Sequence, residues 1–419
     1  MKQCQLLDCA DYVSERVTTA ELTEDTYITT DSMLPNKAGI SRAGNLPPMS
    51  AVCAFKRGDI LLSNIRPYFK KIWLAEFNGG CSADVLVLRT KPGYDNKYIK
   101  SCLSQDIFFE YTMRGSTGSK MPRGDENHIK LFPISDFELA YQQKVGDFLY
   151  TIDTKIAANN RANIEAEQLA KLLYDYWFVQ FNFPDTNGQP YKTSGGELVY
   201  NHDLTRETPT NWGAETLKEW IDEDKGGDWG EEAPSGNNTY KVTCIRGADF
   251  PALSECVSPD APIRYILEKN KAETLAVGDL IIEISGGSPS QSTGRICYIN
   301  HGTLKRFSTA IITSNFCKAI SLKKPQLTYN FYLEWQRLYN AGVFFNYEGK
   351  TTGLKNFLFD IFINSHKIIN PPDNLVEKFY KTVSPLFETI QQNALEAQEL
   401  AKLRDWILPM LMNGQVKVK

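Results

Sequence analysis

The residues best suited to chemistry lie in two polar glycine loops, at 114–120 and 349–355. In the first loop, two glycines let the backbone approach a ligand, hydroxyls can donate hydrogen bonds, and basic side chains supply charge. Together these features favour contacts to phosphate groups, although an exposed turn with solvated charges is the alternative. The candidate contacts are Arg114, Ser116, Thr117, Ser119, Lys120 and Arg123 in the first loop, and Lys350, Thr351, Thr352 and Lys355 in the second.

Two further groups are candidates for nucleic-acid contact. The first alternates basic with aromatic residues, which suits a nucleic-acid face but also suits a plain strand with a solvated edge: Arg66, Lys70 and Lys71 with Tyr68, Phe69 and Trp73. The second is a glycine- and serine-rich stretch that contains Ser288, Ser290, Gln291, Ser292 and Arg295. In it, Gln291 could bind adenine in a bidentate manner, and Arg295 could bind guanine or phosphate.

Motifs for a catalytic function are incomplete. Residues 349–351 read Gly-Lys-Thr, but a phosphate loop needs a glycine five residues earlier, where Phe344 stands. The Asn-Pro-Pro-Asp sequence at 370–373 is similar to an adenine-methyltransferase motif, but Asp373 has no ring to stack on a base. The nine cysteines form no CxxC pair and the four histidines are dispersed, unlike zinc ligands. We therefore predict no catalytic residue, no metal and no cofactor in this chain.

Composition indicates a globular protein with more than one domain. The chain has 419 residues, of which 42% are hydrophobic and 23% charged. No apolar run approaches the 18 residues of a membrane span, and no secretory signal opens the chain, so we expect a cytoplasmic protein. The net charge of −4 favours no polyanionic partner by itself, but local patches rather than net charge decide docking.

The chain repeats itself with a period near 230 residues. Four pairs of segments recur in the same order: 7–13 with 217–221, 56–63 with 276–283, 114–120 with 349–355, and 167–172 with 398–403. The second pair places Gly-Asp before a β-rich run, which predicts a turn into a buried strand. Each half is thus predicted to be a mixed α/β globule followed by one long helix.

Two long helices are predicted, at about 141–178 and 374–411. The apolar positions of the first alternate in steps of four and three, which indicates a coiled-coil seam: Val145, Leu149, Ile152, Ile156, Ala166, Ala170, Leu173 and Trp177. Asn159 and Asn163 fall on this seam. Pro385 should kink the second helix or separate its first turns. Mutual antiparallel packing is favoured over packing of each helix on its own globule. Residues 182–211 are expected to be a linker of turns.

The helical segments resemble the conserved regions of type I restriction–modification specificity subunits. Residues 166–178, followed by Phe-Pro at 183–184 and by 191–196, resemble the central conserved region. Residues 398–404 and 408–414 are similar to the distal one, and 58–61 with 64–68 resemble the start of many target-recognition domains. The resemblance covers essentially the whole chain, although the recognition domains match only by short motifs.

This resemblance implies an α+β fold with two mixed α/β target-recognition domains in pseudo-symmetric tandem, separated by two long antiparallel coiled-coil helices. The implied domains are recognition domain 1 (1–140), central conserved helix (141–180), linker (181–212), recognition domain 2 (213–372), distal conserved helix (373–412) and tail (413–419).

The resemblance also implies a function. Each domain would read half of a split double-stranded DNA site, and the helices would dock methyltransferase subunits, two in number, which restriction/translocase subunits then join. S-adenosylmethionine, ATP and magnesium would be bound by those partners. The alternatives are a coiled-coil scaffold that binds proteins without recognising DNA, and a self-contained methyltransferase, which the incomplete motifs disfavour.

Overall fold

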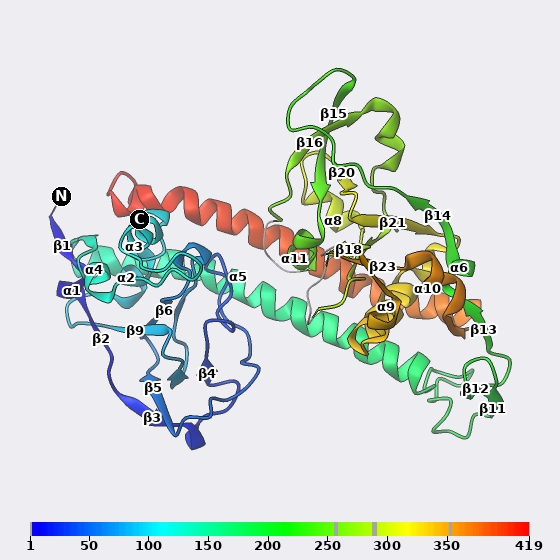
Figure 1. Ribbon diagram of the computed structural model, residues 1–419. Helices are drawn as coiled ribbons and strands as arrows, with labels where there is room; N and C mark the ends of the chain where they lie inside the picture. Colours follow the sequence, from blue (N-terminus) through cyan, green and yellow to red (C-terminus); the bar gives the residue numbers. More distant parts are fainter. Residues whose placement is uncertain (1, 255–258, 287–290, 352–353, 419) are drawn as a thin grey trace. The chain divides into compact units, whose positions relative to one another are not determined.

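The computed structural model describes residues 2–254, 259–286, 291–351 and 354–418 (Figure 1). The chain divides into two compact units. Unit 1 comprises residues 1–160 and 396–419, and unit 2 comprises residues 161–395. Each unit therefore contains one α/β globule together with a portion of each long helix.

Unit 1 is built on two four-stranded sheets, with strand orders β2-β9-β6-β7 and β3-β5-β8-β4. The central strand β6 is buried throughout, as its continuous apolar run predicts. Short helices and a two-stranded pair, β1-β10, complete the globule. The bounds are β1 Gln3–Gln5, α1 Leu6–Cys9, β2 Ala10–Tyr12, β3 Arg16–Thr18, β4 Tyr27–Ile28, β5 Ala51–Phe55, β6 Ile60–Ser63, β7 Ile72–Leu74, β8 Gly79–Cys81, β9 Val85–Thr90, α2 Asn96–Cys102, α3 Asp106–Arg114, α4 Glu126–Lys130 and β10 Pro133–Ser135.

Unit 2 contains a four-stranded sheet of order β14-β21-β17-β19 and two three-stranded sheets, β16-β15-β20 and β18-β23-β22. The bounds are β13 Gly213–Thr216, α6 Leu217–Trp220, β14 Ile221–Lys225, β15 Asn238–Ile245, α7 Phe250–Ser254, β16 Ile263–Leu267, β17 Leu280–Glu283, β18 Ser285–Gly286, β19 Ile296–Tyr298, α8 His301–Lys305, β20 Ala310–Thr313, β21 Cys317–Leu322, α9 Thr328–Asn340, β22 Glu348–Thr351, β23 Leu354–Phe357, α10 Phe359–Ser365 and β24 Lys367–Asn370.

One four-stranded sheet of each globule repeats the same topology, in agreement with the predicted internal repeat, whereas the other sheets differ in their number of strands. In each globule, a short helix leads into an edge strand of this four-stranded sheet, and β6 and β17 occupy the same position in that sheet. The turns before these strands match in detail. Gly58 and Gly278 have φ of +92° and +96°, where only glycine is unstrained. The carbonyls of Asp59 and Asp279 each accept an amide hydrogen bond of 2.8 Å from the neighbouring strand segment.

The long helices α5 (Leu139–Tyr174) and α11 (Asp373–Met412) run antiparallel within each unit. In unit 1, the Tyr141 hydroxyl donates to the carbonyl of Leu411, and the Asn159 amide donates to Glu396 at 2.7 Å. In unit 2, the Trp177 ring packs against Phe379, with centroids 5.5 Å apart. As the residue number on α5 increases, the residue number of its partner on α11 decreases, which is the pattern of an antiparallel pair. A π-helical segment, Asp175–Val179, extends α5.

The two seam asparagines are buried, as predicted, and bond across the helix pair. Asn163 donates to the carbonyl of Ile390 at 2.9 Å and accepts from Asn393 at the same distance. These bonds explain how polar side chains are tolerated on an otherwise apolar stripe, since an unpaired buried amide would be costly.

One of the two alternatives predicted for Pro385, and the expectation that the linker holds only turns, are corrected. Pro385 does not separate the first turns of α11, which begins at Asp373 and is continuous. The proline is exposed, so water can solvate the carbonyl of Lys381, which has lost its helical donor. The predicted linker is more than turns, because 198–201 and 206–209 form a hairpin, β11 (Leu198–Asn201) and β12 (Arg206–Pro209), and Thr208 is buried.

Candidate nucleic-acid interface

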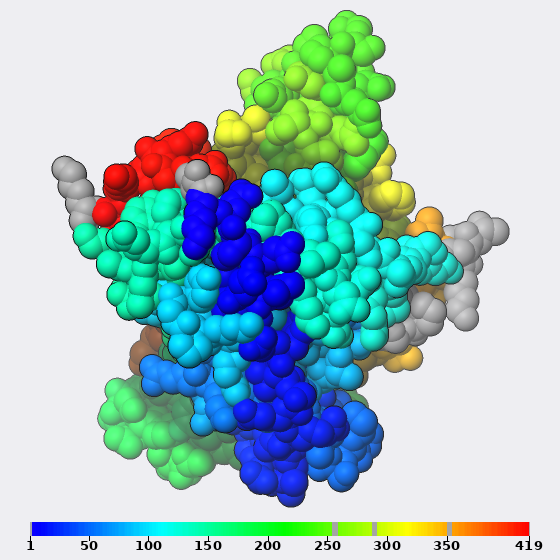
Figure 2. All heavy atoms as spheres, turned by 90° about the vertical axis from the view of Figure 1, so that its left-hand side faces the viewer, coloured from blue at the N-terminus to red at the C-terminus, as the bar shows by residue number. Residues whose placement is uncertain are grey.

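The first glycine loop is a hairpin that projects from unit 1. Thr117 and Arg123 exchange two backbone hydrogen bonds of 2.9 Å and close a loop whose residues 117–121 are exposed. The hairpin is attached to the segment that follows β6, because the Gly124 amide donates to the carbonyl of Asn64 and Ile65 pairs with Arg123. The blue and cyan surface of this unit is visible in Figure 2.

The two glycines of this loop have different roles, and one differs from our expectation. Gly118 has φ +89°, so it supplies the turn. Gly115 instead packs against a ring, because a Cβ there would lie 2.2 Å from Cδ2 of His128. That imidazole stacks on Tyr111 at 4.1 Å. Gly115 is therefore required for packing inside the domain, and only Gly118 serves the exposed loop.

The side chains of the first hairpin differ in their availability. Arg114 and Lys120 are exposed, and no ion pair involves either of them within the described part of the chain. Thr117 and Ser119 are also exposed. Arg123 pairs with Asp84, and the Ser116 hydroxyl donates to the carbonyl of Met113 at 2.7 Å.

The second candidate group lies beside the first, which the sequence did not reveal. The Arg66 amide donates to the carbonyl of Pro122 at 2.8 Å, so the turn after β6 meets the base of the hairpin. Tyr68 and Phe69 are exposed there, whereas Trp73 is buried. The Arg66 Nε atom is buried without a hydrogen-bond partner.

The lysines of this group are bound within the fold. Lys70 pairs with Asp106 at 2.9 Å. The Lys71 Nζ atom donates to the carbonyl of Thr30 at 2.6 Å, and burial lowers the pKa of Lys71. These contacts hold the turn in place, so Arg114 and Lys120 are the more available cations of this surface.

Unit 2 carries a hairpin at the same place in its fold. Strands β22 and β23 form it, and β23 pairs with β18, which follows the central strand β17 as Ile65 follows β6. Lys355 and Glu348 form an ion pair of 2.9 Å across the hairpin, and the buried Ser292 hydroxyl donates to the same carboxylate at 2.9 Å. Burial would raise the pKa of Glu348, but these partners outweigh it and lower that pKa. Ser292 and Lys355 therefore support the hairpin from within.

Only part of the third candidate group lies within the described residues. Arg295 uses Nε and a terminal nitrogen on Glu283, at 2.9 and 2.6 Å, so its bidentate edge is already occupied. Gln291 is exposed. Ser288, Ser290 and Thr352 lie outside the described residues, as do the side chains of Lys350 and Thr351.

Sequence reasoning missed the side chains beside the second hairpin. Trp229, Phe316 and Leu354 are exposed and line a cavity of about 480 Å³. The backbone carbonyl of Phe316 accepts a hydrogen bond from the Ile284 amide. In unit 1, the carbonyl of Asp84 accepts the equivalent bond from the Asn64 amide. The two domains thus present different side chains on one backbone framework. Isolated turn residues carry no periodic signal that could have identified them.

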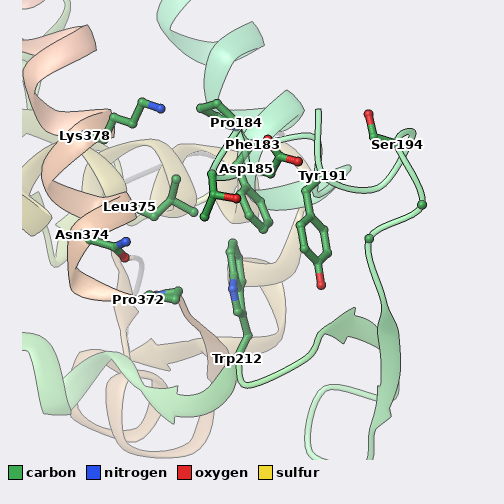
Figure 3. A pocket seen from close by; sticks show the side chains of 13 residues that line it. Phe183, Pro184, Asp185, Tyr191, Ser194, Trp212, Pro372, Asn374, Leu375 and Lys378 are labelled. Atoms are coloured by element: carbon green, nitrogen blue, oxygen red, sulfur yellow. The ribbon is translucent and has the colours of Figure 1, made fainter. Parts of the chain in front are cut away.

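A second cavity, of about 530 Å³, lies in unit 2 between the segment after α5 and the start of α11 (Figure 3). Phe183 stacks between Tyr191 and Trp212, with centroid distances of 4.7 and 4.9 Å. Leu375 and Lys378 of α11 line the facing wall. The cavity is formed by the segment that resembles the central conserved region.

The described residues contain no cluster of three or more histidine, cysteine or acidic side chains that could hold a metal ion. In that same part of the chain, every helix is too short or too polar to cross a membrane.

Comparisons with known proteins agree with the fold. No protein-family model matches the chain. It is 25% identical over 344 residues to the specificity subunit of the type I restriction enzyme MjaIX of Methanocaldococcus jannaschii, covering 78% of this chain and 71% of that protein. It is 23% identical to the HindI specificity subunit of Haemophilus influenzae, covering 99% of both. The crystal structure of a type I S subunit from M. genitalium matches with a TM-score of 0.55 and 14% identity, over 98% of this chain and 95% of that one. The predicted resemblance is therefore confirmed, and the chain is a relative of the type I restriction enzyme specificity subunits.

Proposed function

We propose that this chain is the DNA sequence-specificity subunit of a type I restriction–modification complex and reads a bipartite target with two recognition domains. One observation carries the proposal: in each unit, an equivalent hairpin pairs with the segment after the central strand, in a chain that resembles specificity subunits over its full length. Two readers on one framework suit a split site, and their different side chains suit two different half-sequences.

The same proposal assigns catalysis to other subunits. S-adenosylmethionine, ATP and magnesium would be bound by methyltransferase and restriction/translocase partners, and this chain would contribute recognition and docking. The incomplete catalytic motifs at 349–351 and 370–373 support this division. The coiled-coil scaffold that binds only proteins remains the alternative.

Docking of two methyltransferases is supported by a repeated apolar position on the helices. The Leu-Ala-Lys-Leu sequence recurs at 169–172 and 400–403. Its last leucine is 62% exposed at Leu172 in unit 2 and 44% exposed at Leu403 in unit 1. Exposed apolar side chains at equivalent helical positions favour two copies of one partner.

Separate substitutions test the docking. Leu172→Asp and Leu403→Asp should each remove one methyltransferase from the assembled complex, and the double variant should remove both, as measured by native mass spectrometry. Ile361→Asp, an exposed position on α10, is the matched control. If either single change removed both copies, or if neither removed any, this docking model would be wrong.

Recognition is tested by co-expression with the methyltransferase subunits and by mapping methylated adenines across a genome. The chain alone should methylate nothing, and the complex should methylate one split sequence. Replacing residues 1–137 with those of another specificity subunit should change one half of the target only. A change in both halves would refute the two-reader proposal.

A further inference from the structure

An exposed aromatic turn lies beside the first hairpin. The short 3-10 helix η2 (Pro67–Phe69) exposes Tyr68 by 47% and Phe69 by 39%, whereas Pro67 is buried. The two rings lie together, with centroids 4.7 Å apart. Met121, at the neighbouring hairpin, is also exposed. Grouped apolar side chains on a surface indicate an interaction site, whereas single ones do not.

The backbone around these rings is strained. Arg66 and Lys70, on either side of the turn, have φ of +51° and +53°, and the opposing Asn36 and Lys37 have +56° and +64°. The left-handed region is unfavourable for residues with a side chain. Of the seven non-glycine residues with positive φ in the described chain, four lie at this turn and the segment opposite it. Strain of this kind is concentrated at functional sites, where the surrounding structure maintains it.

Several contacts hold the turn rigidly. The amides of Asn36 and Lys37 donate to the carbonyls of Phe69 and Lys70, at 2.8 and 2.9 Å. The Lys70 ion pair with Asp106 fixes the end of the turn, and the Arg66 amide attaches its beginning to the hairpin base. The rings are thus presented in a set position, so little conformational entropy would be lost when they bind.

The charges next to the rings favour one kind of partner. Arg114 and Lys120 are exposed cations of the attached hairpin, and no ion pair occupies them in the described chain. Exposed rings on a turn that is attached to a hairpin with exposed cations complement a nucleic-acid duplex, whose bases are apolar on their faces and whose backbone is anionic.

We propose that Tyr68 and Phe69 act as a wedge that enters between adjacent base pairs of the first half-site and unstacks one step. The inference rests on the proposed DNA-recognition function and specifies how unit 1 engages the duplex. Apolar side chains inserted between base steps kink DNA, and the cost depends on how easily the sequence deforms. The wedge would therefore add specificity at a step that no hydrogen bond reads.

The test uses the full-length chain assembled with its methyltransferase subunits. The probe is a set of duplexes that carry the mapped target with 2-aminopurine at successive positions of the first half-site. Wild-type binding should raise the fluorescence at one step apart from the methylated adenine, which the methyltransferase itself would extrude. Tyr68→Ser with Phe69→Ser should abolish that rise and weaken binding by about 10- to 100-fold. Tyr200→Ser, an exposed ring on β11, is the control and should change neither measurement.

The other outcomes are distinguishable. Tight, sequence-specific binding with no step unstacked, unchanged in the double variant, would overturn the wedge and leave DNA recognition intact. Failure of the double variant to assemble with the methyltransferase would identify the rings as a protein contact and would also overturn it. A wild-type complex that binds no duplex would overturn the proposed function and the wedge together. Unchanged thermal unfolding of the variants confirms that the fold is preserved.

Discussion

Removal of the Asp153 carboxylate should weaken unit 1 far more than removal of Asp147, which lies on the same helix. Asp153 of α5 accepts from Arg404 of α11 at 2.8 Å and from Lys100 of α2, and its side chain is 13% exposed. The side chains of Lys100 and Arg404 are 6% and 3% exposed. The carboxylate thus compensates two buried cations where helices α5 and α11 meet the globule.

The expected magnitude follows from this burial. Asp153→Ala would leave Lys100 without its carboxylate, and breaking a buried ion pair in this way costs about 3–5 kcal/mol. Asp147 pairs with Lys97 at 2.6 Å, but its side chain is 65% exposed. Exposed pairs contribute about 0–1 kcal/mol, so Asp147→Ala is a matched control of small expected effect.

Hydrogen exchange measured by mass spectrometry can assay this difference locally. For peptides covering 149–157, Asp153→Ala should speed exchange by about a hundred- to a few-thousand-fold, since each 1.4 kcal/mol corresponds to a factor of ten. Asp147→Ala should speed it by less than about fivefold. Equal effects of the two substitutions would refute the reasoning, because burial would then not determine how strongly an ion pair stabilises unit 1.

The same pair predicts a pH dependence. Burial would raise the pKa of Asp153, but the charges of Lys100 and Arg404 outweigh it and hold that pKa below its usual range. A carboxyl whose pKa is lowered by folding stabilises the native state above its unfolded pKa, about 3.9, and this stability is lost as pH falls through the folded pKa. The stability difference between wild type and Asp153→Asn should therefore be constant near neutral pH and shrink below about pH 4.

Two further predictions concern the hairpin and the distal helix. Replacing Arg114 and Lys120 by alanine should lower the slope of log binding constant against log salt by about 2 for the assembled complex, since each phosphate contact contributes about 0.9. Lys144→Ala, on the exposed face of α5, should leave the slope unchanged, and a slope near zero for wild type would favour the protein-binding scaffold. Pro385→Ala should raise the free energy of unfolding of unit 2 by about 2 kcal/mol in urea titration, because it restores a helical hydrogen-bond donor. A destabilised variant would show that the proline is required by the native packing.

Much of the architecture could be predicted from local sequence patterns. The Gly-Asp turns before β6 and β17, the long helices and the buried asparagines at 159 and 163 depend on backbone conformation and periodicity within a few residues, which sequence records directly. Of the two alternatives predicted for Pro385, the separation of the first turns is wrong, because the effect of a proline depends on which side of the helix faces water, and that side is set by tertiary packing.

The composition of the candidate interface was less predictable. The residue types at 114–120 suggested an exposed polar loop, and the hairpin is there, but packing against His128 explains one of its glycines. Arg295 looked free in the sequence, yet Glu283 occupies its guanidinium. An ion pair depends on the distance between side chains, which residue spacing along the chain does not give.

The repeat, the helix pair and the places of the two loops can be read from local sequence, because each is set by short-range backbone preferences and by the spacing of apolar residues. The contact between the turn at 66–70 and the hairpin at 117–123, and the exposure of the cations there, become apparent from the folded chain. These segments are about fifty residues apart, and their contact arises from strand pairing across the domain, which no local pattern encodes.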